Sequence, residues 1–326
     1  MGMYSRVLAT AGDLAYKHVD PSLNFGYENN LSPIEMPVEA GKFREMNDRA
    51  NFLERDFAKT KFTKAQVLTF GDSLRDYSIT PIGGGFQFSN VDLAQPSLYG
   101  KNNKAEMIAE QQMIVALQMK KHIEKAYYTA ISDNTNFGSA SYYNNATTPW
   151  SSIGTANMKG DVRAGKLILG GGPYRLTMSN TAGEYAFDNV TLNASTVVSG
   201  SDRNASVDPN PTAEFLRRYF GVYELVIVSG DLMTDSGDPS DDTKTEIWGD
   251  KVLLERIGNP SIMQPSWMKH LFFAPLGRGK GSGGWFTIQV SDEEVGGVGV
   301  EKWLTWNYLQ LLVQEKTMAY RIDAVY

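Results

Sequence analysis

The residues best placed to do covalent chemistry form the block Gly71-Asp72-Ser73-Leu74, which follows the apolar run Val67–Phe70. A serine at the end of a strand acts as a nucleophile when a histidine within hydrogen-bond reach takes its proton. The chemistry expected of such a serine is hydrolysis of a simple ester. The positions of the histidines therefore decide whether Ser73 has a base.

The block resembles the nucleophile segment of the GDSL esterases, in which the base is a histidine three residues after an aspartate. The residues three positions before His18, His122 and His270 are Ala15, Met119 and Trp267. None of these makes the required pair, and the family's Gly-x-Asn-Asp block is absent as well. An esterase with Ser73 as nucleophile stays a remote alternative, and we expect the protein not to be an enzyme.

A glycine-rich segment, residues 277–284, contains Arg278 and Lys280 and invites a phosphate-binding interpretation. A Walker loop needs Ser or Thr directly after its Gly-Lys pair and an opening glycine farther upstream. Gly281 follows Lys280, and Ala274 occupies the place of the opening glycine, so both requirements fail. We expect the segment to join two strands flexibly, with a contact from its cations to a phosphate or carboxylate as the alternative.

Acidic side chains between residues 235 and 246 suggest a calcium loop. Gly237 and Pro239 stand where ligands belong, however, and Ser240 stands where the sharp-turn glycine belongs. His122 has no partner four residues later, and the chain has no cysteine to ligate a metal. The sequence therefore predicts a solvated loop, no metal site and no cofactor.

Composition limits the classes of partner. The 326 residues carry a formal net charge of −6, which argues against wrapping nucleic acid, because such binding depends on Lys and Arg neutralising phosphates. Contact with a genome should be weak, or confined to a local patch. No stretch approaches the ~20 apolar residues that span a bilayer, and the start lacks a secretory layout. We expect no membrane partner and assembly inside a cell.

The first part of the chain predicts segments that need a neighbour. Residues 1–36 indicate an extended arm with one short helix near Val7–Tyr16, or a disordered tail. Between Glu39 and Lys64, twelve of 26 residues are charged, seven positive and five negative, and phenylalanines lie among them. Because isolated buried charges are costly, we expect a long hairpin that reaches over other protein, continued by strands at 65–70 and 77–82. A solvated charged surface is the alternative.

Residues 102–131 give the clearest helical pattern. Asn103 is an expected N-cap, with Glu106 placed to complete a two-way capping arrangement. The expected apolar stripe is Ile108, Val115, Met119, Ile123, Ala126 and Ala130. The expected polar side is Glu106, Glu110, Lys121 and Glu124. About 28 residues make a rod of roughly 42 Å, which suits the backbone of an elongated molecule.

The rest of the chain predicts an α+β fold. After a Gly/Ser/Asn/Thr-rich passage at 132–160, we expect a strand at 174–179, a helix at 211–220 and a strand at 224–229. Alternating patterns around 286–290 and 318–323 predict half-buried strands.

The order of these pieces resembles that of the tailed-bacteriophage major capsid proteins with the Hong Kong 97-type capsid fold. The hairpin resembles the family's extended loop at 41–46 and 49–57, with a return strand at 70–77. Lys104–Ile131 resembles its spine helix. Residues 174–179 and 215–228 resemble the core of the axial lobe, 247–254 a strand entering the peripheral lobe, and 319–325 the last strand. One departure stands out: residues 154–172 replace the second peripheral helix, with glycines too frequent for a stable helix.

The resemblance implies a division of the chain. We expect an N-terminal arm at 1–36 and an extended β-hairpin loop at 37–95. A peripheral domain at 96–160 would hold the spine helix at 103–131, followed by an axial domain at 161–246 and peripheral return strands at 247–326. The candidate inter-subunit contacts are Lys42, Phe43, Arg44, Arg49, Phe52, Arg55, Phe57, Lys59 and Lys61.

The resemblance also implies a function. The chain would self-assemble through pentamers and hexamers into an icosahedral shell that encloses double-stranded DNA, contacted weakly and non-specifically. Expected partners are a portal protein and, where they exist, scaffold or decoration proteins. The expected location is the virion capsid, with assembly in the host cytoplasm. An encapsulin-type nanocompartment shell and a binding module that does not assemble stay open as alternatives.

Overall fold

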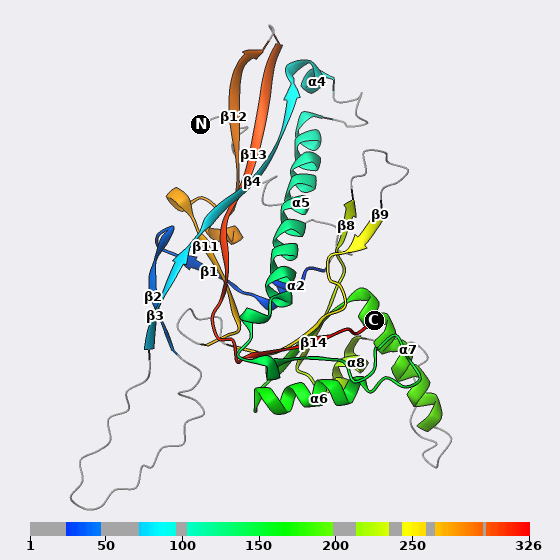
Figure 1. Ribbon diagram of the computed structural model, residues 1–326. Helices are drawn as coiled ribbons and strands as arrows, with labels where there is room; N and C mark the ends of the chain where they lie inside the picture. The colour runs from blue at the N-terminus through cyan, green and yellow to red at the C-terminus, as the bar shows by residue number, and fades with distance from the viewer. Residues whose placement is uncertain are drawn as a thin grey trace, which may run out of the picture.

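The computed structural model describes residues 24–46, 72–95, 103–197, 213–234, 243–258, 265–295 and 298–326. These residues form two five-stranded sheets, two two-stranded sheets and six α-helices, which confirms the α+β class. Figure 1 shows an elongated molecule. One long helix runs beside the first large sheet, and the second large sheet lies with three helices at the other end.

The first large sheet is organised around its longest strand, β13. It is built from β1 (Pro33–Met36), β4 (Thr80–Ser89), β11 (Met268–Phe273), β12 (Trp285–Val295) and β13 (Val298–Val313). β13 pairs antiparallel with β4, β11 and β12, and β1 adds to β11 in parallel. The expected strand around 286–290 is confirmed as part of β12.

The second large sheet has the strand order β5-β14-β10-β6-β7. Its members are β5 (Tyr143–Asn145), β6 (Tyr174–Ser179), β7 (Glu224–Val228), β10 (Val252–Arg256) and β14 (Ala319–Asp323). The strands expected at 174–179 and 224–229 are thereby confirmed. The sheet combines strands from the ranges 96–160, 161–246 and 247–326. Its strand β14 follows β13, so the chain returns to this sheet after completing the first one.

Among the described residues, the remaining elements are two two-stranded sheets, five α-helices and four 3-10 turns. The two-stranded sheets are β2 (Ala40–Met46) with β3 (Asp72–Ser78), and β8 (Asp231–Thr234) with β9 (Thr243–Glu246). The helices besides the long one are α2 (Gly26–Asn30), α4 (Asn90–Ala94), α6 (Met158–Leu169), α7 (Asn180–Val197) and α8 (Ala213–Phe220). The 3-10 turns are η2 (Asn134–Asn136), η3 (Ala140–Tyr142), η4 (Pro275–Gly277) and η5 (Lys280–Ser282).

The long helix is α5 (Lys104–Ser132), and it confirms the expected helix at 103–131. The Asn103 side chain caps it by accepting a hydrogen bond from the Glu106 backbone N–H at 3.0 Å. The buried members of the expected stripe are Ile108, Val115, Met119 and Ile123. Ala126 is exposed and Ala130 is half-buried, so the stripe is shorter than predicted. Glu124 was expected on the polar side, and this prediction is wrong: its side chain is fully buried.

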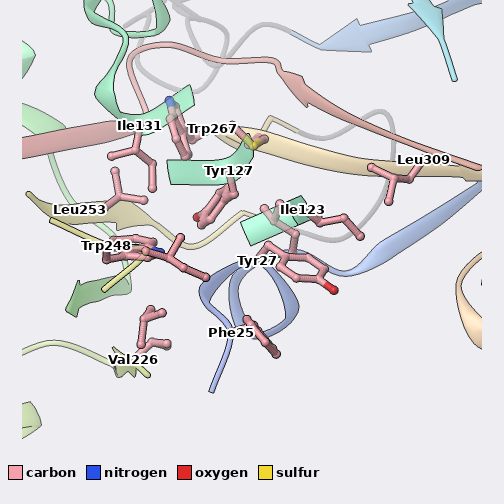
Figure 2. Packing of buried hydrophobic residues seen from close by; sticks show 14 of the residues in the cluster. Phe25, Tyr27, Ile123, Tyr127, Ile131, Val226, Trp248, Leu253, Trp267 and Leu309 are labelled. Atoms are coloured by element: carbon pink, nitrogen blue, oxygen red, sulfur yellow. The ribbon is translucent and has the colours of Figure 1, made fainter. Parts of the chain in front are cut away.

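The larger core lies where α5 and α2 meet both large sheets. Figure 2 shows Tyr27 from α2 and Ile123 and Tyr127 from α5 pointing into this cluster, together with Trp248 and Trp267. Four fully buried or nearly buried aromatic rings explain much of its stability, since each such ring removes a large apolar area from water. The core therefore holds the start of the described chain, the long helix and both sheets together.

A second core fills the opposite face of the second sheet, which α6, α7 and α8 cover. Leu176, Leu254 and Ile322 from three strands meet Val162 of α6 and Leu216 of α8 there. Because the sheet is covered on both faces, the first four residues of β14 are all buried, rather than every second one as its alternating pattern predicted. Its polar residue Arg321 is only 3% exposed.

Helix α6 contradicts the expectation that residues 154–172 are too rich in glycine for a helix. The Asn157 side chain caps it by accepting from the Gly160 N–H at 3.1 Å. A Cβ on Gly165 would lie 2.6 Å from the Tyr320 ring, so this glycine is what lets the helix approach β14 closely. Tertiary packing therefore outweighs the unfavourable helix propensity of glycine.

Two further elements differ from the sequence expectation. Helix α7 was not predicted, because its Asn, Thr, Gly and Ser residues disfavour helix in isolation; its buried face is Ala182, Ala186 and Asn189. The single strand expected at 77–82 is two strands, β3 and β4, which separate at Ile79. Ile79 is 1% exposed and continues the apolar alternation, so the pattern could not reveal the change of partner strand.

Candidate functional site

The expected hairpin begins as a two-stranded sheet that pairs with no other strand among the described residues. β2 and β3 run antiparallel from the pair Ala40 and Ser78 to the pair Met46 and Asp72. Figure 1 shows this sheet leaving the body of the molecule on the side away from the second large sheet. The rest of the hairpin, residues 47–71, lies outside the described residues, as does the strand expected at 65–70.

The base of the hairpin is attached to its own chain by an apolar cluster. Phe43 of β2 packs on Tyr77 of β3 with ring centroids 6.1 Å apart, and Leu271 of β11 lies beneath them. The Arg75 guanidinium adds a hydrogen bond to the Val313 carbonyl oxygen of β13. The hairpin therefore leaves the first sheet at a defined position and direction.

The nine candidate contact residues divide into described and undescribed ones. Phe43 is 9% exposed and its ring is already covered by its own chain. Lys42 lies on the exposed face and pairs with Asp76 at 3.4 Å, an ion pair in water that contributes little stability. Arg44 is placed by its backbone in β2, opposite Leu74. Arg49, Phe52, Arg55, Phe57, Lys59 and Lys61 lie outside the described residues.

A buried carboxylate joins α5 to the start of the described chain. Glu124 accepts hydrogen bonds from the backbone N–H groups of Gly26 and Tyr27, each at 3.0 Å, and from the Trp248 indole N–H. Burial raises its pKa to about 7, and the three donors act in the opposite direction. A Cβ on Gly26 would lie 2.9 Å from the carboxylate, so glycine is needed for this approach.

Further polar contacts continue this attachment along residues 24–31. Glu28 pairs with Lys120 of α5 at 2.9 Å, and Lys120 is only 5% exposed. The Asn30 side chain donates to the Tyr127 hydroxyl and to the Thr177 hydroxyl of β6, both at 2.9 Å. Residues 24–31 are thus held by α5 and by the second sheet together.

Arg175 of β6 completes the attachment from the second sheet. Its guanidinium donates to the Asn30 carbonyl oxygen at 2.7 Å and pairs with Glu255 at 2.9 Å and Glu224 at 2.5 Å. Burial raises the pKa of Glu255, and the neighbouring Arg175 opposes that shift. These carboxylates raise the pKa of Arg175, so the guanidinium remains charged.

Sequence comparison identifies no relative: no family model and no curated protein matches the chain. Solved structures match nearly all of it. A phage-related protein from Bordetella bronchiseptica RB50 has a TM-score of 0.64 at 16% identity, covering 98% of this chain and 97% of its own. A virus-like particle from Pyrococcus furiosus reaches 0.55 at 8% identity over 99% and 100%. The capsid of cyanophage P-SCSP1u reaches 0.51 at 8% identity over 92% and 88%.

The chain has the Hong Kong 97-type capsid fold. In this capsid fold α5 is the spine helix, and β2 with β3 forms the base of the extended loop. The chain therefore shares its fold with phage capsid proteins, and the resemblance of its sequence pattern to that group is confirmed at the level of fold.

Glu124 is the residue of this capsid fold that sequence reasoning missed. Its three donors come from positions 26, 27 and 248, so no local pattern around residue 124 could indicate them. One signal was present: Glu124 lies one residue after Ile123 and three before Tyr127, within the buried part of the helix. A carboxylate at such a position needs partners, because an unpaired buried charge is very costly.

The described residues of the esterase hypothesis lie on three separate elements, and His18 lies outside the described residues. Ser73 is an internal residue of β3, paired with Glu45 in the hairpin. His270 belongs to β11 of the first large sheet, is 5% exposed, and has its pKa lowered to about 4 by burial. His122 lies exposed on the spine helix. The fold thus offers Ser73 a strand in a hairpin rather than the end of a strand in a βαβ series.

The remaining candidate sites concern metals, membranes and small ligands. No group of three or more potential metal ligands occurs in the described part of the chain, and no helix there is long and apolar enough to cross a membrane. A polar pocket beside Arg175 and Glu255 has a volume of about 70 Å³, well below the roughly 300 Å³ of small ligand sites. The calcium-loop residues 235–242 lie outside the described residues.

The glycine-rich segment 277–284 joins β11 to β12, as expected. It is followed directly by a strand, whereas a Walker loop is followed by a helix. Gly284 has a φ of +93°, and a Cβ there would lie 2.9 Å from the Asn307 side chain. Here glycine serves a tight turn and a close approach to β13.

Proposed function

We propose that the chain is the major capsid protein of a tailed bacteriophage. Its copies associate into pentamers and hexamers, which close into an icosahedral shell around double-stranded DNA. The observation that carries this proposal is a capsid fold over nearly the whole chain, in which β2 and β3 leave the first large sheet as a separate two-stranded sheet. The location that follows is the virion capsid, with assembly in the host cytoplasm.

The hairpin supports assembly on physical grounds. An isolated two-stranded sheet is marginally stable in water and needs another surface to cover it. Its own chain supplies such a surface at the base, through Phe43, Tyr77 and Leu271. In the proposed shell a second copy supplies the surface for the rest.

The candidate contacts take different parts in this proposal. Lys42 and Arg44 in β2, with Arg49, Arg55, Lys59 and Lys61 beyond it, provide charges that set the register between copies. Phe52 and Phe57 provide apolar anchors. Phe43, whose ring packs within its own chain, sets the direction of the hairpin instead of contacting the neighbour.

The proposed subunit keeps the division of the chain that the capsid resemblance implies. Each subunit would consist of five consecutive parts. They are the arm at 1–36, the extended loop at 37–95, the peripheral domain at 96–160, the axial domain at 161–246 and the return strands at 247–326. Its partners are other copies, a portal protein, and scaffold or decoration proteins where the phage has them. The packaged DNA is bound weakly and without sequence preference, in keeping with the net charge of −6.

The experiment has two parts. Electron microscopy examines the purified protein, and the source particle is treated with nuclease and then assayed for the nucleic acid that it still contains. Closed particles from the pure protein and nuclease-protected DNA in the source particle support the proposal. A protein that stays monomeric at high concentration contradicts it.

Deletion of residues 47–71, with Met46 joined to Asp72 by a short glycine linker, tests the hairpin separately. The variant should keep the unfolding midpoint of the wild-type subunit, because the base cluster and both cores remain. It should lose assembly. Normal particles from the variant would contradict the role of the extended loop.

An encapsulin-type shell is the second candidate function. The similarity to the virus-like particle from Pyrococcus furiosus favours it over an esterase and over a binding module that does not assemble. A DNA-free particle filled with a cargo protein would select it. Ester hydrolysis that disappears in Ser73→Ala would instead support the esterase.

A further inference from the structure

A basic and partly apolar surface covers the outer side of α6 and α8. We define the basic face as Lys159, Arg163 and Leu167 of α6 with Phe215, Arg218 and Tyr219 of α8. Leu167 is 76% exposed and Phe215 41% exposed. Lys159 lies over the Tyr219 ring at 5.4 Å, which joins the two helices in one surface.

The positive charge of this face is not cancelled within it. Lys159 and Arg163 are four residues apart on α6, and the only carboxylate of that helix, Asp161, is buried. Asp161 accepts from the Trp150 indole N–H at 3.1 Å and so faces inward. On α8, Glu214 is the partner of both Arg217 and Arg218, which leaves that helix positive as well.

A complementary acidic surface lies on α7. The acidic face consists of Glu184 and Asp188, four residues apart and both exposed. The opposite side of α7, with Ala182 and Ala186, is buried against the second sheet. Helix α7 has no cation in its sequence from Asn180 to Val197.

The two faces are different surfaces of one lobe. Helix α8 contacts both α6 and α7, and Figure 1 shows α7 extending outward from the lobe while α6 runs along its lower edge. Two complementary surfaces on one chain make head-to-tail contacts, which close into rings when the rotation allows it.

We infer that the basic face of one copy contacts the acidic face of the next copy around the axis of a pentamer or hexamer. This inference rests on the proposed function and identifies the surfaces through which the rings close. Aromatic and arginine residues are enriched at protein interfaces, and the opposite charges select the partner face. The chain's net charge of −6 favours this occupant over the phosphates of packaged DNA.

Charge reversal on each face gives the first test. The basic-reversed protein carries Lys159→Glu and Arg163→Glu, and the acid-reversed protein carries Glu184→Lys and Asp188→Lys. Each pair of changes should raise the protein concentration needed for assembly by on the order of tenfold or more. Sedimentation velocity and electron microscopy measure that concentration. The protein with all four changes should return to near the wild-type concentration.

A mixture of the two reversed proteins tests whether each is folded, because only folded copies can assemble together. In a mixture, alternating copies again place opposite charges in contact, so six-membered rings should form and five-membered rings should not. The matched control replaces the basic-face changes by Lys121→Glu and Lys125→Glu on α5, at the same spacing. Combined with the acid-reversed changes, this control should not restore assembly.

Three results would overturn the inference. The first is a four-change protein that assembles no better than either reversed protein. The second is wild-type assembly by both reversed proteins; if their particles also lose DNA, the basic face contacts nucleic acid instead. The third is a wild-type protein that forms no rings or particles, which overturns the proposed function as well, whereas the first two leave it standing.

Discussion

Glu124, inside the spine helix, accepts a hydrogen bond from the Trp248 indole, although 124 residues separate them in the chain. The same carboxylate accepts the backbone N–H groups of Gly26 and Tyr27. One side chain thus joins the spine helix, the start of the described chain and the segment leading into β10. Long-range contacts of this kind should decide how stable the subunit is.

Glu124→Gln should destabilise the subunit. A glutamine keeps the size of the side chain but replaces one acceptor oxygen with an NH2 group, which leaves a buried donor without its partner. The expected loss is roughly 1–3 kcal/mol of unfolding free energy, measured by denaturant unfolding of the unassembled protein near pH 5, where the folded-state Glu124 side chain is protonated. Glu39→Gln, at an exposed position, is the control and should change little. Equal effects of the two substitutions would show that the Glu124 contacts add no stability.

The pH dependence of stability should report the same residue. Burial raises the folded-state pKa of Glu124 to about 7, above its unfolded value near 4.5. Between these values the folded state binds a proton that the unfolded state has released, so stability from this group falls as pH rises. Across that window the loss is on the order of 3 kcal/mol. Glu124→Gln should remove this part of the slope; an unchanged slope from pH 4.5 to 7 would contradict the assignment.

Gly165→Ala should destabilise the second core. The added methyl group would lie 2.6 Å from the Tyr320 ring and 2.9 Å from the Leu254 side chain. Overpacking of this kind costs about 1–3 kcal/mol, seen as a lower denaturant midpoint. Gly171→Ala is the matched control, since nothing lies within 4 Å of its added Cβ. A neutral Gly165→Ala would mean that α6 does not approach β14 as described.

Arg175→Met should be among the most damaging single changes. It leaves Glu255, 5% exposed, as a buried carboxylate without its cation, at a cost of about 3–5 kcal/mol. Arg175→Met with Glu255→Leu should recover part of the loss, because the unpaired charge is then gone. The exposed Arg218→Met serves as control. Unfolding free energies of the wild type, Arg175→Met, Glu255→Leu and the double variant measure the coupling, and simple additivity would argue against a direct pair.

Sequence reasoning succeeded where the signal is local. The spine helix was predicted because its run lacks glycine and proline and starts with Asn103 as cap. β6 and β7 were predicted because their apolar runs are short and bounded by turn residues. The capsid fold could be proposed from the order of such elements.

The failures came where distant residues decide the structure. Helix α6 exists because Gly165 fits against Tyr320, and the burial of Glu124 depends on donors at residues 26, 27 and 248. β14 is buried on both sides because α5 covers one face of its sheet and α6 the other. None of these partners lies near the residue concerned in the sequence, so no window of local pattern contains them.

The central claim is that the extended loop of one copy rests on another copy. A reconstruction of assembled particles by electron cryo-microscopy tests it most directly, because it shows residues 40–78 in their final setting. We predict a closed icosahedral particle in which this segment crosses onto the neighbouring subunit. The same segment folded back entirely on its own chain, or a protein that forms no closed particle, would contradict the account.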